Sequence, residues 1–173
     1  MMAGTGDMIE GSRETCWRRW FVAPVKVQLG QGMSAERISW TIALGIVLGV
    51  FPVMGTPTLL CLLAGWALCL NHVLLQVFKE AMYPLHLALI LVFIRLGERL
   101  WGAPLISFSI PELLGKFKAD PLQFARDFGM AAWHGVSAWL LIAPVAAVLI
   151  KWAITPGVRR LAESLEKRKE VVK

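Results

Sequence analysis

A run of 41 residues without any Asp, Glu, Lys or Arg, residues 38–78, imposes the strongest constraint on the fold of this chain. A helix that crosses a bilayer needs about 20 apolar residues, so the run is too long for one crossing. Two prolines and a glycine interrupt it near the middle, in the sequence PVMGTPT from Pro52 to Thr58. The run therefore predicts a Pro/Gly-broken helical hairpin whose two arms cover about 38–70.

The lengths of the two arms leave two interpretations of the hairpin open. The first arm, from Ile38 to about Phe51, is roughly 21 Å long, whereas a crossing needs about 30 Å. The second arm starts near Pro57, which suits the first turn of a helix capped by Thr56. Either both arms cross the membrane at a tilt, or the hairpin is re-entrant.

The composition also indicates a membrane protein. Apolar residues make up 57% of the 173 residues and charged residues 17%, and the mean hydropathy is +0.61. A soluble domain is about half apolar and a quarter charged. Two further segments, at about 72–94 and about 128–154, are long and apolar enough to span a bilayer. We therefore expect an all-α, polytopic integral membrane protein with three to four membrane helical segments.

Polar regions flank and divide the predicted membrane domain, residues 37–154. Residues 1–36 form a basic aromatic region expected at the interface, residues 95–127 an amphipathic extramembrane loop with the short helices PELLGKF and PLQFARDF, and residues 155–173 a basic tail. The N-terminal region serves either as a plain positive flank or as an anchor on anionic lipid. Its aromatic and basic residues are Trp17, Arg18, Arg19, Trp20, Phe21 and Lys26.

The basic residues predict the orientation of the chain in the membrane. Lys and Arg number 18 against 12 Asp and Glu, a net charge of +6, and they flank the apolar segments instead of forming one patch. This placement favours membrane lipids over nucleic acid as the partner. Because the two ends together carry more Lys and Arg than the central loop, both termini are expected to be cytoplasmic.

Polar side chains recur at helical spacing along the predicted helix at about 72–94. Ionisable groups at membrane depth are costly and usually face a cavity or a partner, so this polar stripe is a candidate substrate-binding surface. Pro84 is expected to kink the helix beside it. In the alternative, Lys79 extends to the interface and the histidines bond to the backbone. The stripe consists of His72, Gln76, Lys79, Glu80, Tyr83 and His86.

Two glycine-containing motifs suggest specific roles within the hairpin. In a re-entrant hairpin the turn at Gly55, Thr56 and Thr58 is a candidate anion-binding site, because a helix N-terminus presents unpaired N–H groups and a positive dipole end. The alternative is an ordinary capped turn. Gly45 and Gly49 form a GxxxG motif, which is expected to pack against the second arm or, alternatively, to form a homodimer.

The residues that usually carry catalysis are sparse. The three histidines lack Cys, Asp or Glu at metal-ligand spacing, and the chain has no GxSxG, Walker or dinucleotide-binding loop. Two of the three cysteines lie inside the apolar run, where thiols behave as small hydrophobes. We therefore expect no enzyme activity, no metal and no cofactor.

The segment from Arg37 to Gly102 resembles the bacterial membrane family catalogued as domain of unknown function 2062. In this family an Asn-Pro pair is usual where the present chain has Tyr83 and Pro84. The resemblance implies a small bacterial inner-membrane protein, sometimes joined to a glycosyltransferase domain. It rests on Ala43, Leu44, Gly45 and Gly49, on Pro52, Gly55 and Thr58, and on Asn71, Pro84 and Gly97.

Two functions are compatible with these features and with the family resemblance. In the first, the protein acts in cell-envelope biogenesis and transports or flips a lipid-linked phosphate intermediate. In the second, it is a non-transporting scaffold that anchors a glycosyltransferase or another partner through the GxxxG face and the aromatic-basic N-terminal region. A dispensable Lys79 together with an essential GxxxG would favour the scaffold.

Overall fold

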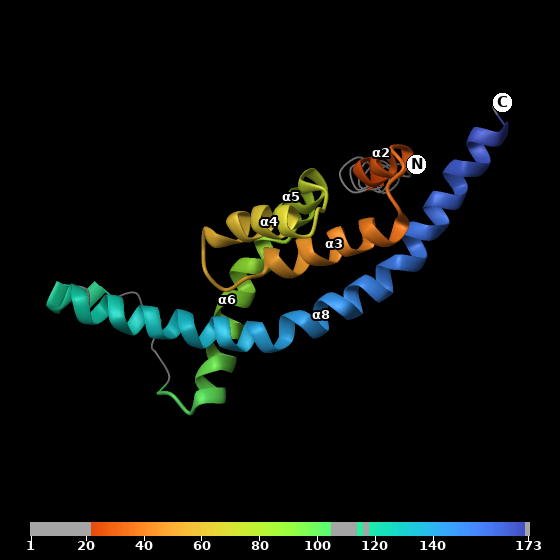
Figure 1. The fold of residues 1–173 in the computed structure, drawn as a ribbon. Helices are drawn as coiled ribbons and strands as arrows, with labels where there is room; N and C mark the ends of the chain where they lie inside the picture. Colours follow the sequence, from red (N-terminus) through yellow and green to blue (C-terminus); the bar gives the residue numbers. More distant parts are fainter. Residues whose placement is uncertain (1–21, 105–113, 116–117, 172–173) are drawn as a thin grey trace, which may run out of the picture.

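The computed structural model describes residues 22–104, 114–115 and 118–171, and over this part the chain is all-helical, as predicted (Figure 1). The predicted anchor at residues 17–21 and most of the PELLGKF segment lie outside the described residues. Six helices are assigned within the described part: α2 (Ala23–Gly30), α3 (Ala35–Gly49), α4 (Thr56–Ala67), α5 (His72–Ala81), α6 (Tyr83–Trp101) and α8 (Pro121–Val171).

Side-chain caps set where several of the helices begin. The Ser34 hydroxyl accepts the N–H of Arg37 at the start of α3, and the Asn71 side chain accepts the N–H of Leu74 at the start of α5. Each cap satisfies one of the backbone donors that a helix N-terminus leaves unpaired. Of the two, Asn71 interrupts the apolar run where the chain passes from α4 to α5.

The break between α3 and α4 ends in a glycine cap. Gly55 adopts a left-handed conformation with φ of 83°, which a residue without Cβ tolerates best. Thr56, expected to be the cap, is instead the first residue of α4, and its hydroxyl donates to the Val53 carbonyl at 2.7 Å. The chain therefore makes its turn one residue earlier than the Thr-Pro sequence suggested.

The GxxxG motif packs within the chain, but against α5 instead of the expected second arm, α4. A Cβ on Gly45 would lie 2.9 Å from the carbonyl oxygen of Leu75, and one on Gly49 would lie 3.1 Å from the Cα of Lys79. Because α5 follows α4 after a short connection, it runs beside α3 and occupies the groove that the two glycines leave. The prediction that this face contacts the second arm is wrong.

The single helix expected at about 72–94 is divided into α5 and α6, which meet at Met82 with a bend of 68°. Pro84 lies in the first turn of α6. Residues in the first turn donate no hydrogen bond within the helix, so the missing N–H of proline costs nothing there. The expected effect of Pro84 is thus observed as a break and not as a mild kink. As a result α5 lies along α3, whereas α6 leaves the hairpin and crosses α8 (Figure 1).

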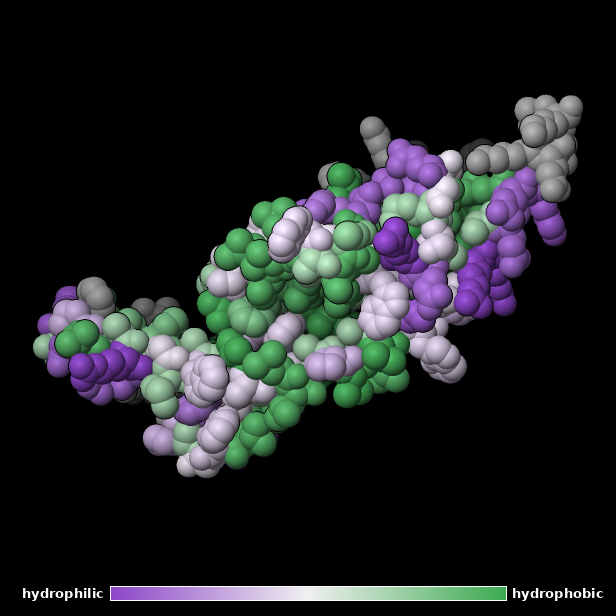
Figure 2. All heavy atoms as spheres, in the orientation of Figure 1, coloured by the Kyte–Doolittle hydropathy of each residue, from purple (hydrophilic) through white to green (hydrophobic). Residues whose placement is uncertain are grey.

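One long helix, α8, replaces three separate predicted elements. It absorbs the PLQFARDF segment, the predicted helix at about 128–154 and most of the predicted tail, with Pro144 and Pro156 inside it. Among the described residues one helix is long and apolar enough to cross a membrane, and it is this one. Figure 2 shows apolar side chains over the middle of the molecule and hydrophilic ones toward its two ends.

A buried cluster joins the hairpin break to α8. The Trp139 indole Nε1 donates to the Val47 carbonyl oxygen at 3.2 Å, and the Phe51 ring meets Trp139 edge to face with the centroids 4.9 Å apart. Phe93 of α6 and Ala138 belong to the same cluster. These contacts hold α3, α6 and α8 together beside the break.

The α6–α8 crossing depends on the absence of a side chain at Gly97. A Cβ at this position would overlap the backbone carbonyl of His134, so the two helix backbones lie in direct contact. On the facing helix, Gly135 lies against Ile94. Gly97→Ala should therefore lower the free energy of unfolding by at least about 1–3 kcal/mol, the usual cost of overpacking.

Thermal unfolding of the detergent-solubilised protein would measure this effect. Gly129→Ala on α8 is the matched control, because nothing lies within 4 Å of a Cβ there. It should leave the protein as stable as the wild type or slightly more stable, since alanine is favoured over glycine in helices. Equal melting temperatures for the two variants would contradict the proposed crossing geometry.

Candidate functional site

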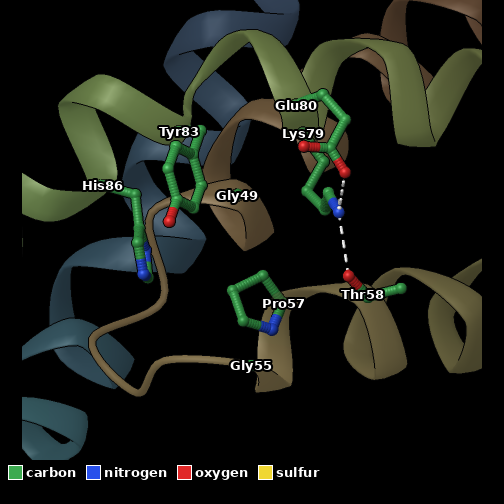
Figure 3. A pocket seen from close by; sticks show the side chains of 8 residues that line it. All are labelled: Gly49, Gly55, Pro57, Thr58, Lys79, Glu80, Tyr83 and His86. Atoms are coloured by element: carbon green, nitrogen blue, oxygen red, sulfur yellow. Dashed lines mark hydrogen bonds and ion pairs between the residues drawn. The ribbon is translucent and has the colours of Figure 1, made fainter.

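A polar pocket of about 200 Å³ forms where the hairpin break meets the junction of α5 and α6 (Figure 3). The end of α3, the start of α4, the end of α5 and the start of α6 each contribute to its wall. Its lining residues are Gly49, Gly55, Pro57, Thr58, Lys79, Glu80, Tyr83 and His86. This set combines parts of the predicted polar stripe with parts of the predicted anion-binding turn.

Lys79 is the central cation of the pocket. The residue is only 8% exposed, and its Nζ donates to Thr58 Oγ1 at 2.8 Å and pairs with the Glu80 carboxylate (Figure 3). Because Thr58 lies in the first turn of α4, the ammonium group is held beside the positive end of that helix dipole. Two positive sources therefore meet at one place, which favours an anion there.

The Glu80 carboxylate partly offsets this positive charge. Its side chain is 65% exposed, so the pair with Lys79 is open on one side. Both long side chains also lose conformational freedom on pairing, which reduces the net contribution of the pair. An anion of higher charge that enters the pocket would therefore meet a weakly held competitor for Lys79.

His86 adds a buried polar group to the same wall. The residue is 3% exposed, and its Nδ1 has no hydrogen-bond partner among the described residues. Its ring stacks on Tyr83 with the centroids 6.3 Å apart. A buried polar atom without a partner costs about 1–3 kcal/mol, so a ligand that bonds to it would recover that energy.

The bend at Met82 divides the predicted polar stripe. Lys79, Glu80, Tyr83 and His86 line the pocket, but His72 and Gln76 do not. His72 begins α5, and its ring fills the space over Gly65 of α4, where a Cβ would lie 2.6 Å from the ring. A periodicity of three and four residues predicts one face of a straight helix, and it cannot reveal where that helix breaks.

The predicted anion-binding turn is only partly present in the pocket. Gly55 and Thr58 line it, whereas the Thr56 hydroxyl is used by the Val53 carbonyl. Gly49 is a lining residue that the sequence analysis assigned only to helix packing. The GxxxG spacing could have indicated that Gly49 lines the pocket. A close helix approach at this motif also brings side chains of the partner helix next to its last glycine.

The pocket brings together groups that can contact an anion. The Lys79 ammonium and the Thr58 hydroxyl can each donate a hydrogen bond to oxygen, and the His86 imidazole lies in the same wall. Within the part of the chain that the structure describes, no group of three or more His, Cys, Asp and Glu is placed to hold a metal ion.

Comparison of the chain with protein-family models, with curated proteins and with solved structures finds no match.

The bond between Lys79 and Thr58 gives a direct test of the pocket geometry. Thr58→Val removes the hydroxyl that accepts from the buried ammonium and should lower the free energy of unfolding by about 1 kcal/mol. Thr58→Ser keeps the hydroxyl and should restore most of that loss. Chemical or thermal unfolding in detergent measures both variants, and equal stability of the two would mean that the bond contributes nothing.

Proposed function

We propose that this chain is a polytopic protein of the bacterial inner membrane that binds the phosphate of a lipid-linked intermediate and transports or flips it during cell-envelope biogenesis. The observation that carries the proposal is the buried Lys79 ammonium held at the N-terminus of α4.

Contacts between α3 and α8 define one boundary of the apolar zone. Lys151 Nζ bonds to the Glu36 carboxylate at 2.8 Å and lies 5.5 Å from the centroid of the Trp40 ring. The hydrogen bond and charge of Lys151 lower the pKa of Glu36, which keeps the pair ionised at neutral pH. Charged residues with tryptophan are typical of the membrane–water interface. The start of α3 is thus expected at the interface.

The hairpin break is expected at about the middle of the membrane. The charge-free part of α8, residues 128–150, is about 35 Å long, which matches a bilayer. Trp139 lies near the centre of that part, about 18 Å along the helix from Lys151. Because Phe51 at the break packs on Trp139, the pocket is expected at similar depth.

This depth favours a re-entrant hairpin over a spanning one. The 15 residues of α3 cover about 22 Å, less than the hydrocarbon thickness of about 30 Å, and α4 then returns toward the start of α3. In this proposal the bent pair α5 and α6 would form a broken span and α8 a continuous one. Together with the hairpin, counted as one or two segments, they would make three to four membrane segments.

A phosphate group fits the donors in the pocket. Lys79 and the first turn of α4 supply positive charge, and Thr58 supplies a hydroxyl. On entry the phosphate would take Lys79 from Glu80, and on release Glu80 would take it back. Lys79 would therefore remain paired with Glu80 when the pocket holds no phosphate.

The alternative function, a scaffold for a glycosyltransferase or another partner, loses one of its supports. The GxxxG face that was expected to serve it is covered by α5, so Gly45 and Gly49 are not accessible to a second chain. A scaffold would have to use other exposed apolar surface, such as that of α4, where Leu63 and Trp66 lie.

Labelling of single cysteines tests whether the hairpin is re-entrant. In a cysteine-free background, cysteines replace Thr56 at the break, Gln123 at the start of α8 and Arg159 near its end. An impermeant maleimide should label Gln123→Cys from the outside and Arg159→Cys from the cytoplasm. It should label Thr56→Cys from the outside much more slowly than Gln123→Cys, because the break lies within the membrane. Equally fast outside labelling of both would mean a spanning hairpin.

Binding of a polyprenyl phosphate to the nanodisc-reconstituted protein tests the role of Lys79. Lys79→Gln should weaken binding about tenfold to a hundredfold, since a charge-assisted hydrogen bond is lost. Glu80→Gln removes the competing carboxylate and should tighten binding. Lys118→Gln removes an exposed cation that does not line the pocket and is the matched control.

Flipping of the same lipid in proteoliposomes then separates transport from binding. Wild-type affinity and activity in Lys79→Gln would overturn the proposal. A Lys79→Gln variant that still co-purifies with a partner protein but no longer flips the lipid would support transport over the scaffold.

A further inference from the structure

A second cavity lies at the opposite end of the hairpin from the Lys79 pocket. Its volume is about 400 Å³, within the usual range of about 300–1,000 Å³ for small-molecule sites. It is formed between the first half of α3 and the turn that joins α4 to α5. Its lining residues are Arg37, Trp40, Leu44, Leu68 and Leu70, none of which lines the Lys79 pocket.

The walls of this groove combine apolar surface with a single cation. Three leucines supply the apolar surface, and Trp40 contributes an indole ring. The Arg37 side chain is exposed and makes no hydrogen bond or ion pair with any residue that the structure describes. A guanidinium group binds phosphate oxygens in a bidentate manner and stays charged at any physiological pH.

The groove lies at the boundary of the apolar zone. Arg37 follows Glu36, the residue that bonds to Lys151, and Trp40 lies beneath the Lys151 ammonium. Arg159 also acts on Glu36 electrostatically, so cations gather at this level. The headgroup of a phospholipid lies at this depth, and its acyl chains start just below it.

We infer that this groove binds an anionic phospholipid, with its phosphate at Arg37 and one acyl chain along Leu44, Leu68 and Leu70. The cations favour a lipid with net negative charge over a zwitterionic lipid, whose headgroup carries its own positive charge. The bound lipid would bridge α3 to the α4–α5 turn and hold the open end of the hairpin together. The inference does not depend on the proposed transport function.

Quenching of Trp40 by brominated lipids tests the inference on the full-length chain in nanodiscs. Brominated phosphatidylglycerol is the anionic probe and brominated phosphatidylcholine the zwitterionic one. Because the chain has eight tryptophans, the difference between the wild type and Trp40→Phe isolates the signal of Trp40. We expect phosphatidylglycerol to quench Trp40 at a lower mole fraction than phosphatidylcholine does.

Two pairs of variants separate the groove from general attraction to an anionic surface. Arg37→Gln should reduce the preference for phosphatidylglycerol about fivefold, the typical effect of one basic residue at such a surface. Arg160→Gln removes an exposed cation on α8 that does not line the groove and should change nothing. Leu68→Gln should weaken retention of the lipid, whereas Leu63→Gln, equally exposed on α4, should not.

Three results would overturn the inference. Equal losses in Arg37→Gln and Arg160→Gln would mean diffuse electrostatic attraction. Equal quenching by the two lipids would mean that the headgroup charge is not recognised. No Trp40-dependent quenching by either lipid would mean that another part of the chain, or another molecule, fills the groove. Lys79→Gln should leave all of these measurements unchanged, which separates this site from the proposed phosphate pocket.

Discussion

The close contact between α3 and α5 is the constraint on which the rest of the site depends. Gly49 has no side chain, so the backbone of α5 at Lys79 lies directly against it. From there the lysine extends to Thr58 at the start of α4. Any side chain at Gly49 would move α5 away from α3 and separate the ammonium from the helix end. Backbone packing thus sets the electrostatics of the pocket.

This arrangement places the Lys79 ammonium beside the positive N-terminus of α4, and the rest of the fold must offset the resulting electrostatic repulsion. An ammonium beside a helix N-terminus is unfavourable in isolation, because both repel cations. Glu80 supplies the compensating charge from an exposed position, and His86 Nδ1 remains without a partner in the described structure. Polar groups at membrane depth are retained mainly where they serve binding or transport, which agrees with the function we propose.

The two cavities of the hairpin differ in position and in chemistry. The Lys79 pocket lies at the break, where Phe51 packs on Trp139, and its lining combines polar and apolar surface. The Arg37 groove lies at the charged boundary and is mostly apolar. In the proposed scheme, the groove anchors a resident lipid while the pocket handles a lipid-linked phosphate. The same hairpin would then contact lipid phosphates at two levels.

The sequence by itself determined the helical class, the Pro/Gly break at Pro52–Thr58 and the position of a chain break near Pro84, because these depend on local residue properties. It also identified Lys79 and Thr58 as candidates, but not their contact. The tertiary structure decided that the GxxxG face meets α5, that the polar stripe divides at Met82, and that a groove opens beside Arg37. These features depend on the directions of helices after each turn, and local spacing carries no information about those directions.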